Sequence, residues 1–379
     1  MNILLTLHHA LDPNAGAPGA IFRTGESYLQ RGHQVSYFSF DNVPQILPEI
    51  AKTVLFPEFV AAHVRQLQHI DIIEAMTGDA WLWQKLFHRQ KSDQIISTQS
   101  QGLEHIVHLE CLEDAKRAHL KLSWKYPLYH GGLRLWEVSN SLRGADLVFL
   151  LNQQDRDYAT GHIGVNPSKA HVIPNGISEA FLGLPFYSTP LDENIPIKIA
   201  QIGRYILRKG IHYTATALNS ILAKYPHVEI SFIGTGCPLE EVHRDFASEF
   251  RGRVHVVPHY SNQELPQLLK DHQIKLLPSL SEGFGIAIVE AMACGLVPIA
   301  TTVQGPKEII TDGKDGYLVP PRDAAAIEKS LIDILENRHR LEHLRRCAYS
   351  TAQNYSWANI ADKKLALYET LLSQRKHRL

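Results

Sequence analysis

Residues 281–295 read SEGFGIAIVEAMACG, and this stretch decides more about the chain than any other. Glu282 stands beside a glycine just before an apolar helical run, and Glu290 lies eight positions later inside that run. A carboxylate among apolar side chains is costly to bury unless a partner takes up its charge. The stretch therefore predicts that a polar ligand binds at the start of a core helix.

Two glycines allow a ligand to approach this backbone closely. Gly283 and Gly285 have no Cβ, and a helix that begins near Gly285 presents unpaired N–H groups in its first turn. Such a turn attracts anions such as phosphate. Glu290 follows about one and a half turns later, at about 3.6 residues per turn. This layout fits a nucleoside diphosphate sugar, although Glu290 as an internal bridge and the glycines as a plain turn form the alternative.

Composition is typical of a globular protein with a large buried core. The chain has 379 residues, which predicts two domains or slightly more. Apolar residues make up 44% and charged residues 20%. Lys and Arg number 38 against 39 Asp and Glu, and this net charge of −1 gives no reason to propose a nucleic-acid partner.

Targeting signals and cysteine usage suggest a cytoplasmic protein. The first residues read as a strand rather than a signal peptide, and no apolar run approaches the ~18 residues of a membrane span. The four cysteines are far apart, without a C-x-x-C pair, which fits a reducing compartment. Histidine pairs such as His105 and His108 lack carboxylate or cysteine companions at ligand spacing, so no metal is expected. We expect a location in the cytoplasm, or peripherally at the inner face of a membrane.

Short β-branched runs alternate with amphipathic helices along the chain, which favours parallel α/β layering. The alternation pauses at 182–190, a looser stretch with prolines and glycine, and then begins again. We therefore predict an α/β fold with two Rossmann-like domains facing a central cleft, over 1–180 and 193–355. The predicted strands are 2–7, 35–40, 70–74, 94–98, 146–151 and 172–177, then 197–202, 228–233, 254–257, 274–277, 296–300 and 317–319. The predicted helices are 20–31, 211–224, 324–337, 338–355 and 357–372.

A basic pair follows the first strand of the second half. Residues 202–210 read IGRYILRKG, which places Gly203, Arg204 and Lys209 beyond the carboxyl end of the strand. A guanidinium forks onto phosphate oxygens and a lysine adds a point charge. The pair can hold a diphosphate and stabilise it as it leaves. A solvated basic loop is the simpler alternative.

Two glycine-containing loops are weaker signals. Residues 231–236 form a strand followed by G-x-G, but the third glycine and the acidic residue of a dinucleotide fingerprint are missing. We interpret this as a tight turn near the nucleotide base. Gly16 and Gly19 precede an amphipathic helix and are predicted to form a loop whose N–H groups face the diphosphate across the cleft. A plain flexible loop explains them equally well.

Residues 115–136 combine cations with aromatic side chains and contain no Asp or Glu. This composition suits an anionic membrane surface or acceptor. A helix and loop that line the cleft form the simpler interpretation, which we favour. The cations are Lys116, Arg117, Lys121, Lys125 and Arg134.

Assembled, these segments resemble a known family, the retaining nucleotide-sugar glycosyltransferases of family 4, which have the GT-B fold. Glu282, seven residues and Glu290 are similar to the family's paired-glutamate motif, which is its most specific part. The resemblance covers nearly the whole chain and implies that residues 356–379 form a helix that packs back on the first domain. The supporting segments match the phosphate-binding pair, the lead into the second domain and the last helix: 203–210, 172–177 and 355–372.

The resemblance implies a role for each site residue. Glu282 contacts sugar hydroxyls, Glu290 takes the ribose hydroxyls, and the amides of Phe284, Gly285 and Ile286 contact sugar and diphosphate. Arg204 and Lys209 neutralise the leaving diphosphate. The first domain lies on the acceptor side and the second binds the donor. No cofactor or metal is implied beyond the nucleotide diphosphate sugar as co-substrate, and retention needs no protein nucleophile.

Some positions depart from the family pattern. Many members have two adjacent glycines where Gly16 and Gly19 are separated here, and a histidine where Gln101 stands; His105 is a weak substitute. Residues 303–306 also replace a common double glycine. These departures leave a catalytically silent nucleotide-sugar-binding protein as an alternative, and a nucleotide-dependent oxidoreductase or epimerase as a more distant one. The donor base, the sugar, the acceptor and the oligomeric state are left open.

Overall fold

A computed structural model describes residues 1–13, 16–87, 94–116, 121–188 and 195–376. The chain divides into two compact units, which are Met1–Gly176 with Trp357–Leu379 (unit 1) and Ile177–Ser356 (unit 2). The first unit thus ends at Gly176, close to the boundary expected near residue 180. At the boundary Gly176 packs so closely on Trp357 that a Cβ would lie 2.6 Å from the Trp357 backbone nitrogen, which explains the need for glycine.

Unit 1 is built on a parallel sheet in the order β2-β1-β3-β4-β5-β6. Its middle strands are buried along their whole length, as expected of a sheet covered by helices on both faces. The strands are β1 (Asn2–Thr6), β2 (Gln34–Phe38), β3 (Ile72–Met76), β4 (Ile95–Gln99), β5 (Leu147–Leu150) and β6 (Ala170–Val172). The helices are α1 (Gly16–Gln30), α2 (Glu49–Gln66), α3 (Trp81–Leu86), α4 (Glu104–Lys116), α5 (Arg134–Gly144), α6 (Gln153–Tyr158) and α14 (Trp357–Lys376).

Unit 2 repeats the design with the strand order β12-β11-β10-β7-β8-β9, again parallel throughout. One contiguous apolar core joins strand residues such as Ile199 and Phe232 to helix residues such as Leu218 and Leu331. The strands are β7 (Ile197–Ile202), β8 (Val228–Ile233), β9 (Val254–Val257), β10 (Ile274–Leu277), β11 (Val297–Thr301) and β12 (Tyr317–Val319). The helices are α7 (Ile211–Lys224), α8 (Leu239–His243), α9 (Leu265–Leu269), α10 (Ile286–Ala293), α11 (Gln304–Ile309), α12 (Ala324–Leu335) and α13 (Arg338–Ala352).

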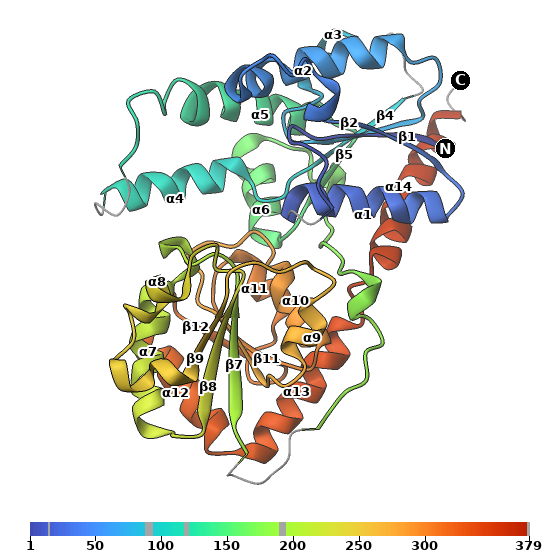
Figure 1. Ribbon diagram of the computed structural model, residues 1–379. Helices are drawn as coiled ribbons and strands as arrows, with labels where there is room; N and C mark the ends of the chain where they lie inside the picture. The colour runs from blue at the N-terminus through green and yellow to red at the C-terminus, as the bar shows by residue number, and fades with distance from the viewer. Residues whose placement is uncertain (14–15, 88–93, 117–120, 189–194, 377–379) are drawn as a thin grey trace. The chain divides into compact units, whose positions relative to one another are not determined.

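The last helix returns to the first unit. α14 packs against α1 and β4, and Figure 1 shows it in red beside α1. Lys364 of α14 is fully buried there and reaches Glu74 of β3, with 2.6 Å between Nζ and Oε1. The hydroxyls of Tyr28 and Tyr368 donate to the other oxygen of Glu74, each at 2.7 Å. The expected packing of the final helix on the first domain is confirmed.

Several elements differ from the prediction, and two of these differences have a local cause in a proline. The strand expected at 172–177 is β6 at Ala170–Val172, because Pro174 cannot donate to a sheet and the chain leaves the sheet before it. The helix α2 was not predicted at all, since Pro57 lies in its interior, where proline normally removes a helical hydrogen bond. The two-unit α/β architecture itself is confirmed.

Candidate active site

The sheet of unit 2 has a switch point between β7 and β10. Strands are added on one side from β7 to β9 and on the other from β10 to β12. In such sheets ligands bind beyond the carboxyl ends of the strands at this point. Gly203 and Arg204 follow β7 directly, and the loop after β10 carries Glu282. The topology therefore brings the predicted basic pair and the first glutamate to one place.

Lys209 and Glu282 form an ion pair there, with 2.5 Å between Nζ and Oε2. Ser279 Oγ donates to the same carboxylate oxygen at 3.3 Å. The two side chains keep 19% and 16% of their surface exposed. The backbone N–H of Leu280 donates to the carbonyl of Arg208 at 2.9 Å and so joins the two loops. A cation and a carboxylate thus lie together, partly exposed, where two hydrogen-bonded loops meet.

The second cation lies on the other side of the same strand end. Arg204 is exposed, and a Cβ on Gly236 would lie 3.6 Å from its Nε. Gly203 has φ 125°, and a Cβ on it would lie 3.8 Å from Cε of Lys209. Lys209 and Arg204 therefore flank the end of β7, one beside Gly203 and one beside the G-x-G turn.

The predicted helix start is confirmed. Gly285 is the N-cap of α10 with φ 91°, a left-handed conformation that favours glycine. The Phe284 ring is buried, with its centroid 6.0 Å from that of Tyr355. Phe284 therefore offers its backbone rather than its ring at the turn. Ile286 is the first residue of α10, so its N–H has no intrahelical partner, whereas the N–H of Ile288 donates to the carbonyl of Gly285 at 2.8 Å.

α11 packs against the turn that precedes α10. Gly305 N–H donates to the carbonyl of Glu282 at 2.9 Å. A Cβ on Gly305 would lie 2.2 Å from the carbonyl oxygen of Phe284, so only glycine fits. Gly305 belongs to segment 303–306, which replaces a double glycine common in the family, and it therefore has a clear packing role.

Glu290 lies on α10 and is almost fully buried. Asn262, which sequence analysis did not identify, donates to its Oε1 at 2.8 Å. Burial and the Glu290 charge raise the pKa of Tyr260 to about 12, and the same two causes raise the pKa of Cys294 to about 12. Asn262 comes from the loop after β9, so this contact orients the carboxylate from a different element.

Lys275 is a second residue that sequence analysis missed. It lies in the middle of β10, is fully buried, and donates to the carbonyl of Leu276 at 2.9 Å. Its amine also faces the carbonyl of Ile202, 3.5 Å away at the end of β7. Burial, and then the Lys209 charge, lower its pKa well below the ordinary lysine value, whereas Glu282 and Glu290 oppose the shift. An amine whose charged form is disfavoured by burial therefore lies beneath the end of β7.

The glycines of unit 1 do not form the predicted loop. α1 begins at Gly16, and Pro18 is tolerated in its first turn because no intrahelical N–H is required there. A Cβ on Gly19 would lie 2.7 Å from the carbonyl oxygen of Pro13, so Gly19 lets the preceding chain pass closely. Gly16 has open space around it. Both belong to the first helical turn, where an anion contact stays a prediction.

Gln101 and His105 are both engaged. Asn175 donates to Oε1 of Gln101 at 2.8 Å. His105 Nε2 lies 2.9 Å from Oγ of Ser139, and burial lowers its pKa. The contact with Ser139 does not indicate that His105 replaces the histidine that many family members have at the position of Gln101.

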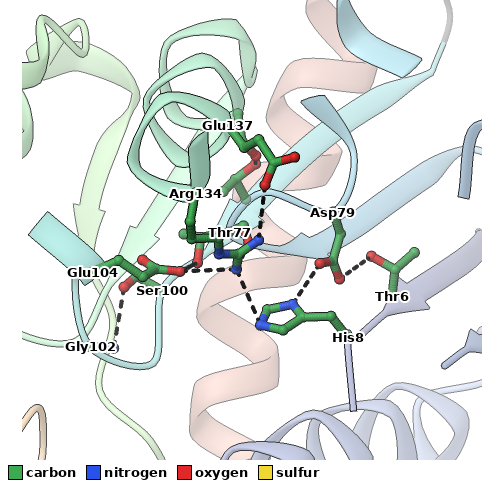
Figure 2. Close-up of polar contacts among 11 residues, drawn as sticks. Thr6, His8, Thr77, Asp79, Ser100, Gly102, Glu104, Arg134 and Glu137 are labelled. Atoms are coloured by element: carbon green, nitrogen blue, oxygen red, sulfur yellow. Dashed lines mark hydrogen bonds and ion pairs between the residues drawn. The ribbon is translucent and has the colours of Figure 1, made fainter. Parts of the chain in front are cut away.

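The carboxyl ends of the strands in unit 1 carry a polar cluster that sequence analysis did not find. His8 follows β1 and Asp79 follows β3, with 2.7 Å between Nδ1 and Oδ1 (Figure 2). Arg134 Nη2 lies 3.2 Å from Nε2 of the same ring. Glu104 and Glu137 complete the group, 3.2 and 3.8 Å from the guanidinium. We call these five residues the His8 cluster.

Only part of the predicted basic and aromatic stretch, residues 115–136, is exposed. Arg134 is buried in the His8 cluster and so is no surface cation. Trp124 and Leu128 are exposed, at 78% and 66%. Arg117 lies outside the described residues. Over the part of the chain that the structure describes, no helix is long and apolar enough to cross a membrane, and no three His, Cys, Asp or Glu residues are grouped for a metal ion.

Comparison with known proteins supports the resemblance. Residues 190–353 match the family described as "Glycosyl transferases group 1". The phosphatidyl-myo-inositol mannosyltransferase of Mycolicibacterium smegmatis is 30% identical over 210 residues, which are 54% of this chain and 53% of that protein. The chain spans about half the length of the first curated relatives it matches.

Solved structures share the fold. Sucrose-phosphate synthase (tll1590) from Thermosynechococcus elongatus superposes with a TM-score of 0.77 at 21% identity, over 98% of this chain and 99% of that one. Anabaena Alr3699/HepE in complex with UDP-glucose gives 0.66 at 18% identity, over 98% and 100%. The GT-B-type fold and the likeness to glycosyltransferases that the sequence indicated are thus confirmed.

Proposed function

We propose, for a chain whose second unit matches the group 1 glycosyl transferases, that it transfers a hexose from a nucleotide diphosphate sugar to an acceptor hydroxyl. Transfer would retain the anomeric configuration and need no metal ion. The observation that carries the proposal is the Lys209–Glu282 pair at the switch point of unit 2, beside the start of α10. A related fold has been solved with UDP-glucose.

The chemistry follows from charge placement. Lys209 and Arg204 stabilise the negative charge that develops on the departing diphosphate, helped by the N–H groups of the first turn of α10. Glu282 orients the sugar through its hydroxyls, and Glu290, held by Asn262, takes the ribose hydroxyls. The bond between the anomeric carbon and the phosphate oxygen breaks as the acceptor oxygen bonds the same carbon from the same face. A phosphate oxygen of the leaving group accepts the acceptor's proton.

The acceptor side is proposed to be unit 1, with a glycan, a lipid or a small molecule as acceptor. A relative acts on phosphatidyl-myo-inositol by its name. In this chain Trp124 and Leu128 are exposed within the segment 115–136, which would supply a peripheral membrane contact. We propose a cytoplasmic location, with any membrane contact at the inner face.

A donor panel tests the proposal. Thermal-shift measurements with nucleotide diphosphate sugars should show stabilisation by one donor and by its free diphosphate, about 2.7 kcal/mol at a hundredfold excess over Kd. Product analysis should then show retained configuration. Inverted product would rule out the mechanism, and tight NAD binding would point to the oxidoreductase alternative.

Variants separate catalysis from binding. Glu282→Ala should cut turnover strongly, Glu290→Ala should weaken donor binding, and Arg204→Ala with Lys209→Ala should nearly abolish transfer. Lys224→Ala, an exposed lysine on α7 paired with Glu328, is the matched control. Wild-type turnover in the Arg204 and Lys209 double variant would show that this pair does not stabilise the leaving diphosphate. If the native protein bound the donor but neither hydrolysed it nor transferred its sugar, the alternative of a catalytically silent nucleotide-sugar-binding protein would be favoured.

A further inference from the structure

The sheet of unit 1 has its own switch point, between β1 and β3. Its order places β2 on one side of β1, and β3 through β6 on the other. Ligands bind at such points beyond the carboxyl ends of the strands. His8 is the second residue after β1, and Asp79 is the third after β3. The His8 cluster therefore occupies the place in this sheet where the fold favours a ligand.

Asp79 determines the state of the histidine. Its carboxylate is fully buried, accepts from Thr6 Oγ1 at 3.0 Å through Oδ2, and faces His8 Nδ1 through Oδ1. An ionised carboxylate only accepts, so Nδ1 of His8 carries the hydrogen and donates. Arg134 always donates, so the hydrogen bond at Nε2 requires a neutral ring with its lone pair on that atom. His8 is thus held as a hydrogen-bond acceptor at Nε2.

The contact at Nε2 is weakly held. Nη2 of Arg134 has two hydrogens but three acceptors, which are the Thr77 carbonyl at 2.7 Å, His8 Nε2 at 3.2 Å and Glu104 Oε1 at 3.2 Å. The short bond to Thr77 takes one hydrogen, and the other two acceptors share the second. A ligand hydroxyl can therefore donate to His8 Nε2 while Arg134 keeps its other partners (Figure 2).

Two further polar atoms lack partners within the described residues. The Tyr129 hydroxyl and Glu104 Oε2 are both shielded from solvent, and neither has a hydrogen bond there. Burial raises the pKa of Tyr129 to about 12, and the charges of Arg134, Glu137, Asp79 and Glu104 all act on it, so Tyr129 lies near the cluster. Buried polar groups normally have partners. The Tyr129 hydroxyl can therefore donate to a bound ligand, and Glu104 Oε2 can accept from one.

We infer that the His8 cluster is an acceptor site for an uncharged polyhydroxylated compound, whose hydroxyl donates to His8 Nε2. Hydroxyl groups both donate and accept, which matches Nε2, Glu104 Oε2 and the Tyr129 hydroxyl together. A phosphorylated compound would meet the carboxylates of Asp79, Glu104 and Glu137 against the single cation of Arg134. The inference rests on the proposed function, because it names the class of the second substrate.

Saturation-transfer NMR on the full chain, with and without UDP, tests this directly. The probes are glucose, galactose and myo-inositol, each beside its monophosphate. His8→Asn keeps a donor for Asp79 but deletes Nε2, Tyr129→Phe deletes only a hydroxyl, and His69→Asn changes an exposed histidine before β3 as a control. The neutral polyols should bind the wild type and the control, and each cluster variant should raise Kd about 3- to 10-fold, the size of one lost hydrogen bond.

Three results would overturn the site. These are unchanged polyol binding in both cluster variants, binding of the monophosphates alone, and binding of no neutral polyol to the wild type. Donor titration in the same samples separates the two proposals, because the donor is proposed to bind unit 2. If the wild type bound none of the nucleoside diphosphates of the donor panel, this would count against the glycosyltransferase function. Binding of one of them, with unchanged polyol binding in the variants, would count against the site only.

Discussion

At the scale of single residues, the buried amine of Lys275 has a measurable cost. The fold disfavours its charged form, so unfolding takes up a proton and the free energy of unfolding rises with pH toward the ordinary lysine pKa. Lys275→Met removes the amine at similar volume. We expect the variant to be more stable than the wild type at pH 7 and to show a smaller gain between pH 7 and 9. Urea unfolding followed by far-UV circular dichroism measures both, and equal pH slopes would contradict the burial argument.

Asn262 offers a second prediction at this scale. Its amide is the partner that orients Glu290, so Asn262→Ala should raise the donor Kd about 3- to 10-fold without a comparable loss of kcat. Gln263→Ala, at the exposed neighbouring position, is the control. Isothermal titration with UDP and steady-state kinetics give the two numbers. An unchanged Kd would mean that Glu290 needs no help from Asn262.

At the scale of elements, α11 and the turn before α10 form one packed unit. Alanine is normally better than glycine in a helix by about 1 kcal/mol. At Gly305 the opposite is expected, because the new Cβ would lie 2.2 Å from the Phe284 carbonyl oxygen and the turn would have to move. Gly305→Ala should therefore both destabilise unit 2 and weaken donor binding.

Gly252→Ala is the matched control, since nothing lies within 4 Å of a Cβ there. Urea unfolding and UDP titration should show a loss of about 1–3 kcal/mol for Gly305→Ala and almost none for Gly252→Ala. A fully stable Gly305→Ala protein with native UDP affinity would show that the two elements are not tightly coupled.

At the scale of the whole molecule, α14 supplies unit 1 with a buried charge from the far end of the chain. Lys364 and Glu74 are 290 positions apart and are fully buried together. Removing one partner of such a pair typically costs 3–5 kcal/mol, whereas replacing both is far milder. Lys364→Met should thus destabilise unit 1 strongly, and Glu74→Gln with Lys364→Met should recover much of the loss.

The chain provides its own probe for this test. Its five tryptophans, at positions 81, 83, 124, 136 and 357, all belong to unit 1. Tryptophan fluorescence in urea should therefore show an earlier transition in Lys364→Met, while UDP binding by unit 2 persists below that transition. The same midpoint in both proteins would mean that α14 is held by its apolar contacts alone.

Unit 2 was the more predictable half. The bounds of β7, β8, β9, β10 and β12 agree with the sequence, because each is a short run rich in apolar residues that is followed directly by glycine or proline. The start of α10 was also readable, since Gly285 and the two glutamates lie within nine residues. Local chemistry sufficed wherever all the signals lay in one segment.

The sequence by itself determined the α/β class, the two-unit plan and the residues around the start of α10, because strand periodicity and short glycine-flanked motifs are local properties. Only the tertiary structure placed Lys209 against Glu282, Asn262 against Glu290, and His8 between Asp79 and Arg134. His8 lies 71 positions from Asp79 and 126 from Arg134, and no local pattern links them. Contacts at such distances exist because parallel strands bring their carboxyl ends to one edge of a sheet, whatever their separation along the chain.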